Sequence, residues 1–147
     1  TSGLGQLDVE VISSSIAVAR ILDHLATGRD ENYGYELAVG LHDVCTEYSI
    51  TRNGNWIFHH CNDETSEGDI VYFSLHALRL AGIKPEDILR VLYYGTNVSD
   101  ARLSGLGKTF GKRVASLNPM PVVDINTDRF DEGFRFESFA LCLGAAL

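Results

Sequence analysis

The dipeptide Asn53-Gly54 joins two runs of residues that read as β-strands. In the first run, residues 44–50, every second residue is apolar, aromatic or threonine, as expected of a strand with one buried face. Asn-Gly accepts the positive φ angles that both central residues of a type I′ turn require, so a β-hairpin is predicted here. The second strand, residues 56–61, begins Trp-Ile-Phe, is apolar on both faces and is expected inside the sheet.

Helical and strand patterns alternate along most of the remaining chain. Helices are expected over residues 13–28, 66–82 and 98–114, and further strands over 88–94, 121–128 and 134–143. The segment between the first helix and residue 44 reads as a loop that leads into a strand. This order predicts an α+β domain, in which two helices pack on one face of a single mixed sheet. The domain would span residues 41–147, behind an N-terminal helical extension at residues 1–40.

Charge and cysteine content narrow the class of partner. The net charge of −8 disfavours a groove for nucleic acid, and no apolar run approaches the ~20 residues that span a bilayer. The three cysteines are widely spaced without a CxxC pair, which is typical of reduced thiols in a cytoplasmic protein. We therefore expect a soluble protein that binds a small molecule or another protein.

Over residues 53–142, the order and spacing of several segments resemble those of the RidA family, also called YjgF, of small enamine and imine deaminases. The segments are GNWIFHHCN, HALRLAGIKPEDILRVLYYGTNVSD, LGKTFGKR followed by NPMPVVDI, and EGFRFESFALC. The resemblance implies a RidA-like (chorismate-mutase-like) fold and a homotrimer with a small-molecule cleft at each subunit interface. It implies no cofactor.

The chain departs from the family pattern at the site. Met120, or Pro121 with a one-residue shift, stands where family deaminases carry an arginine. The last strand of the family carries two acidic residues; here Arg135 replaces the first, and the second is Glu137. The expected function is therefore not standard imine deamination. It is the binding or transformation of a small anionic or aromatic metabolite by acid/base chemistry, or else a non-catalytic trimeric binding or structural role. A chorismatase-like hydrolase and a fragment of a thiolase-type acyl synthase are further alternatives, so whether the chain is an enzyme stays open.

Eight residues are candidates for this site. The catalytic candidates are Glu137, Arg135, His60 and Cys61, and the substrate-binding candidates are His59, Tyr94, Asn97 and Met120. Strand alternation places His59 and Cys61 on one face and His60 on the other, so no metal site is expected. Structural alternatives are open for most of them: packed histidines, a cysteine that serves as a small buried apolar residue, an ion pair between Arg135 and Glu137, and a helix cap within residues 96–100.

Overall fold

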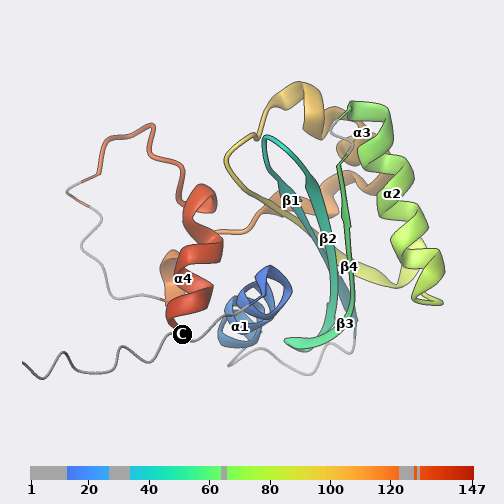
Figure 1. Cartoon of the computed structure of the whole chain (residues 1–147), viewed down its shortest axis with the longest axis horizontal. Coiled ribbons are helices and arrows are strands. Elements are labelled where there is room, and N and C mark those ends of the chain that lie inside the picture. Colours follow the sequence, from blue (N-terminus) through green and yellow to red (C-terminus); the bar gives the residue numbers. More distant parts are fainter. Residues whose placement is uncertain (1–12, 27–33, 64–65, 123–127, 129) are drawn as a thin grey trace, which may run out of the picture.

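The computed structural model describes residues 13–26, 34–63, 66–122, 128 and 130–147. Its centre is a five-stranded mixed sheet in the order β3-β2-β1-β4-β5 (Figure 1). The strands are β1 (Tyr35–Leu41), β2 (Thr46–Arg52), β3 (Asn55–Asn62), β4 (Ile88–Tyr94) and β5 (Val114–Ser116). The helices are α1 (Ser14–Ala26), α2 (Glu67–Leu80), α3 (Asp100–Phe110) and α4 (Ala140–Ala146). None of the helices in the described ranges is long and apolar enough to cross a membrane.

The strands combine a meander with two crossovers. β1, β2 and β3 follow one another in antiparallel pairs, whereas β4 pairs parallel to β1 and β5 pairs parallel to β4. Parallel neighbours need a long connection, and the helices α2 and α3 supply it. The carboxyl ends of β1 and β4 consequently lie at the same edge of the sheet.

Helices cover both faces of the sheet (Figure 1). On one face, the apolar residues of α2 and α3, such as Leu78 and Leu106, form one buried cluster with those of β1, β2 and β4, such as Val39. On the other face, α1 and α4 pack against Ala38 and Leu92. The prediction of helices on one face only was wrong, because the central strands β1 and β4 are apolar on both sides and need a second cover.

The predicted hairpin is confirmed, but the place of its second strand is not. Asn53 and Gly54 have φ angles of 51° and 76°, as the turn requires. β3 lies at the edge of the sheet rather than inside it. Trp56 and Ile57 are 53% and 42% exposed, beside a register shift between β2 and β3. A short apolar run does not by itself distinguish a buried strand from an exposed edge.

The two strands predicted near the C-terminus are not strands in the described residues. Residues 120–122 and 136–139 form short 3-10 turns, and the latter leads into α4; residues 123–127 lie outside the described ranges. Alanine and leucine dominate α4 and favour a helix over a strand. A Cβ atom on Gly144 would lie 2.2 Å from the backbone oxygen of Ala17, so the glycine allows α4 to pack closely on α1.

Candidate ligand-binding site

Two loops meet where the parallel strands β1 and β4 end. Residues 42–45 follow Leu41 at the end of β1, and residues 95–99 follow Tyr94 at the end of β4. The backbone N–H of Asn97 donates a hydrogen bond to the carbonyl oxygen of Leu41 at 3.0 Å, which holds the loops side by side. Ligands of open α/β sheets bind at the carboxyl ends of parallel strands. The carboxyl-terminal edge of the sheet, formed by these two loops, is therefore the candidate site.

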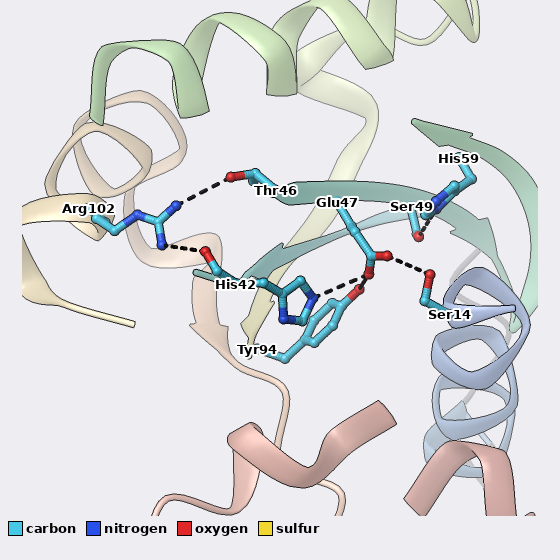
Figure 2. Close-up of polar contacts among 8 residues, drawn as sticks. All are labelled: Ser14, His42, Thr46, Glu47, Ser49, His59, Tyr94 and Arg102. Atoms are coloured by element: carbon cyan, nitrogen blue, oxygen red, sulfur yellow. Dashed lines mark hydrogen bonds and ion pairs between the residues drawn. The ribbon is translucent and has the colours of Figure 1, made fainter. Parts of the chain in front are cut away.

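The guanidinium of Arg102 on α3 donates hydrogen bonds to both loops and to the start of β2. Nη1 donates to the carbonyl oxygen of Asn97 at 2.7 Å and makes a longer contact with that of His42 at 3.5 Å. Nη2 donates to Thr46 Oγ1 at 3.3 Å (Figure 2). The backbone N–H of Arg102 donates to Ser99 Oγ at 3.3 Å, which caps the helix. Because a guanidinium spreads its donors in a fixed fork, one buried side chain sets the spacing of the two loops.

Beside this edge, the carboxylate of Glu47 is surrounded by hydrogen-bond donors (Figure 2). Ser14 Oγ of α1 donates to Oε1 at 2.6 Å, the Tyr94 hydroxyl donates to Oε2 at 3.0 Å, and His42 Nε2 lies 3.4 Å from Oε2. Burial acts to raise the pKa of Glu47, but the hydrogen bonds with His42, Ser14 and Tyr94 outweigh it and lower the pKa to about 2. Glu47 is therefore an ionised and weakly basic group at neutral pH.

Tyr94 keeps its proton in this environment. Burial, followed by the negative charge of Glu47, raises the pKa of Tyr94 well above its ordinary value. The hydroxyl is therefore a permanent donor, and it joins β4 to β2. Together with the Ser14 contact, this bond ties α1 to the edge of the sheet at which the loops meet.

The histidine candidates lie on opposite faces of β3, as the alternation predicted. His59 Nδ1 shares a hydrogen bond of 2.9 Å with Ser49 Oγ, and burial lowers the pKa of His59. The ring of His60 lies 6.4 Å from that of Tyr48 and 6.1 Å from that of Phe73, on the face covered by α2. Both histidines thus have structural partners, and a role in a ligand site stays a prediction.

Cys61 is exposed on β3, beside Cys45. Partial burial, followed by the contact with Cys45, raises the pKa of Cys61 to about 11. The thiolate is the nucleophilic form of cysteine, so a raised pKa works against the predicted nucleophilic role. No group of three or more His, Cys, Asp and Glu side chains comes together as a metal site within the described part of the chain.

The remaining candidates lie in or near the loop at residues 95–99. Tyr94 and Asn97 belong to the edge itself, and Met120 is half-buried in the turn at residues 120–122. Arg135 and Glu137 each make one hydrogen bond to the backbone of this loop. Arg135 Nη1 donates to the carbonyl oxygen of Val98 at 2.9 Å, and the carbonyl oxygen of Glu137 accepts from the N–H of Gly95 at 3.2 Å. Catalytic roles for Arg135 and Glu137 stay predictions.

Four residues of the edge were missed from the sequence: Ser14, His42, Glu47 and Arg102. Arg102 did leave a signal, because Arg102, Leu106 and Phe110, the buried residues of α3, follow one another at intervals of four. A charged residue on the apolar stripe of a helix must find polar partners inside. Glu47 left no such signal, because its carboxylate is bound by Ser14 of α1 and this helix was predicted to lie in a separate extension.

Comparison with known proteins identifies the fold. No protein-family model and no curated protein matches the chain. The chain is similar to a solved PilM-PilN type IV pilus biogenesis complex, with a TM-score of 0.66, 15% identity and coverage of 94% of this chain and 52% of that chain. It is also similar to a Bacteroides thetaiotaomicron protein of unknown function with an actin-like ATPase fold (TM-score 0.54, 13% identity, 70% of this chain and 40% of that chain).

A third similar structure is the apo psk41 ParM protein, with a TM-score of 0.55, 7% identity and coverage of 88% of this chain and 46% of that chain. The chain has the actin-like ATPase fold, and it spans about half the length or less of these structures. At such identities the likeness defines the fold alone.

This finding corrects the RidA resemblance. The matching segments share local order with that family, but strands predicted over 121–128 and 134–143 were needed to complete its sheet. Of the described residues there, 121–122 and 136–143 lie in 3-10 turns and in α4. The RidA-like fold and the acid/base chemistry on a small metabolite were therefore wrong, and the homotrimer with an interface cleft loses the resemblance on which it rested. The non-catalytic trimer, the chorismatase-like hydrolase and the acyl synthase fragment lose their support with them.

Proposed function

We propose that the chain binds a nucleotide, as its magnesium complex, at the edge formed by residues 42–45 and 95–99. The observation that carries the proposal is the hydrogen bond between the Asn97 N–H and the Leu41 carbonyl oxygen, which joins the loops at the carboxyl ends of β1 and β4. The actin-like ATPase fold, a name that one similar structure carries in its description, supports a nucleotide as the ligand.

The residues of the two loops fit a magnesium nucleotide better than a free phosphate. Neither loop contains lysine or arginine, and Arg102 is already bound to the loops themselves. Asp43 in the first loop and Asp100 at the start of α3 are both exposed. Mg²⁺ is commonly held by one or two carboxylates together with the phosphates of its substrate. The cation would remove the repulsion between these carboxylates and the phosphates.

The proposal concerns binding rather than hydrolysis. Glu47 is the buried carboxylate beside the edge, and its three hydrogen-bonded contacts and its pKa of about 2 make it a poor general base. Its geometry suits the fixing of α1 and the loops instead.

Isothermal titration calorimetry with ATP and ADP tests the proposal. We expect binding in Mg²⁺ and its loss in EDTA. The double variant Asp43→Asn with Asp100→Asn should bind about tenfold more weakly in Mg²⁺, because the cation loses its carboxylates. Asp87→Asn is the matched control, since this exposed acid precedes β4 at its amino end. Equal affinity of the double variant and the wild type in Mg²⁺ would contradict the proposed site.

A second candidate function is the binding of another protein without any nucleotide. The absence of lysine and arginine from both loops favours this candidate, because neither loop offers a basic side chain to neutralise the phosphates of a nucleotide. Only the cation could then do so. The PilM-PilN structure is described as a biogenesis complex, and a role in such an assembly is compatible with this candidate. The same titration separates the two, since this candidate requires no heat of binding with either nucleotide in Mg²⁺.

A further inference from the structure

Four phenylalanines gather in the segment that leads into α4, and we call them the Phe cluster: Phe130, Phe134, Phe136 and Phe139. Their ring centroids are 4.6–5.4 Å apart, and the rings of Phe134 and Phe139 are stacked with an interplanar angle of 7°. Rings at such distances attract one another, so the cluster holds its own shape in a segment without strands.

The Phe cluster is only partly covered by the rest of the protein. Phe134 and Phe139 are 37% and 47% exposed, and Phe130 is exposed as well. Single exposed apolar residues are ordinary, whereas a contiguous group of aromatic side chains at the surface marks an interaction site. Aromatic side chains also dominate the energetic centres of protein interfaces.

The surroundings of the Phe cluster are acidic. Residues 128–137 contain four acidic residues and two arginines, in a chain whose net charge is −8. Asp131 and Glu132 are exposed between Phe130 and Phe134. One of the arginines, Arg135, is exposed and donates a hydrogen bond to the carbonyl oxygen of Val98, so the acidic residues still outnumber the basic ones. The charge that an approaching partner meets around the apolar surface is therefore negative.

We propose that the Phe cluster is a docking surface for a segment of another protein that carries apolar anchor side chains flanked by lysine or arginine. The anchors contact Phe134 and Phe139, and the basic residues pair with Asp131 and Glu132. An apolar centre with a complementary charged rim is the usual anatomy of a specific protein interface. A second copy of this chain fits less well because its own charge is −8, and an anionic membrane would be repelled for the same reason.

The segment that carries the docking surface is hydrogen-bonded to the loop at residues 95–99 of the candidate ligand-binding site. The carbonyl oxygen of Glu137, between Phe136 and Phe139, accepts the hydrogen bond from the Gly95 N–H, and Arg135 binds the next part of the same loop. The surface is nevertheless defined by its own aromatic and acidic residues. Its occupation by a partner does not require that the loops bind a nucleotide.

Selection from a random peptide library displayed on phage tests the proposal with a defined probe. Peptides are selected on the whole chain, synthesised, and titrated against the wild type and the double variant Phe134→Ser with Phe139→Ser. We expect selected peptides enriched in aromatic or aliphatic residues together with Lys and Arg, whose affinity falls about tenfold or more on the variant. Tyr72→Ser on α2 is the matched control, since this exposed aromatic lies on the other face of the sheet.

Three outcomes would overturn the proposal. The first is that all selected peptides bind the Phe134→Ser, Phe139→Ser variant as tightly as the wild type. The second is that the peptides whose binding is weakened by this variant show no excess of lysine and arginine. The third is a mass in solution that shows a dimer of the wild type and a monomer of the variant, because a second copy would then be the occupant. Should the serine variant not fold, Asp131→Lys with Glu132→Lys keeps the phenylalanines and must still weaken basic peptides about tenfold.

Discussion

The hydroxyl of Tyr94 reaches across β1 and donates a hydrogen bond to Glu47 on β2 at 3.0 Å. Gly40 of β1 is paired with Glu47 on one side and with Tyr94 on the other, so the three residues form a row across neighbouring strands. A Cβ atom on Gly40 would lie 2.6 Å from the Tyr94 ring. The missing side chain in the middle of the row is thus what allows the two ends to meet.

The first prediction concerns this row. Gly40→Ala should lower the free energy of unfolding by about 1–3 kcal/mol, because the new methyl group displaces the Tyr94 ring in a packed layer. Urea denaturation measures the change. Gly107→Ala is the matched control: nothing lies within 4 Å of its Cβ position, and the α3 helix should gain up to about 1 kcal/mol. A Gly40→Ala protein as stable as the wild type would show that the ring has room.

The second prediction is a pH dependence that arises from Glu47. Its pKa of about 2 in the folded protein lies below the ordinary value of 4.5, so its ionised form stabilises the fold above about pH 4.5. That contribution, at most about 3 kcal/mol, is lost as the pH falls through 2. Glu47→Gln should therefore destabilise the protein at pH ~6 and have little effect at pH ~2.

Urea denaturation of the wild type and Glu47→Gln at both pH values measures this difference. Glu86→Gln, at an exposed position before β4, should change the free energy of unfolding by less than about 0.5 kcal/mol at either pH. A penalty for Glu47→Gln that is the same at both pH values would mean that its charge contributes nothing to stability.

The third prediction concerns Arg102. Arg102→Met should cost about 2–4 kcal/mol, because the carbonyl oxygen of Asn97 and the hydroxyl of Thr46 lose a charged donor inside the protein. The two loops should also separate more often, so hydrogen exchange at the Asn97 amide should accelerate. Arg79→Met, at an exposed position of α2, is the control and should leave that amide unchanged. Unchanged exchange in Arg102→Met would show that the loops hold together without it.

The fourth prediction tests whether α1 belongs to the same folding unit as the sheet. Ile21 is fully buried in the layer that α1 and α4 form, so Ile21→Ala should lower the free energy of unfolding by about 2–5 kcal/mol. Ile16→Ala on the same helix, where the side chain is 47% exposed, should cost less than about 1 kcal/mol. Thermal unfolding followed by near-UV circular dichroism provides the measurement. Two separate transitions would indicate an independent extension.

Local patterns predicted the elements whose signals lie within a few residues. The turn at Asn53-Gly54, the strand at residues 88–94 and the helices around residues 14–26, 67–80 and 100–110 all have such signals, and the structure confirms them. The Ser99 cap of α3 belongs to this group, since capping depends on adjacent residues. The signals that predict these features lie within each element, although β4 pairs with the distant strand β1 in the fold.

What sequence reasoning missed was decided by packing over long distances. The helix at residues 14–26 was read as an extension, yet Ser14 binds Glu47, and neither residue alone indicates the other. Likewise, the alternating pattern at residues 134–143 suits a strand, but residues 136–146 form a 3-10 turn and the helix α4, which packs on α1 from the other end of the described chain. Among the residues near the two loops, Asn97 was a candidate because it follows a buried strand and Tyr94 because its hydroxyl could reach a cleft, whereas the positions of Glu47 and Arg102 required the fold.

The close packing of α1 and α4 through Gly144 has a consequence for the synthesis of the protein. These helices come from opposite ends of the described chain, yet they share one face of the sheet. Until α4 has been synthesised, that face has only one of these two helices. Completion of the layer therefore has to wait until residues 140–146 have been synthesised, long after the strands that it covers.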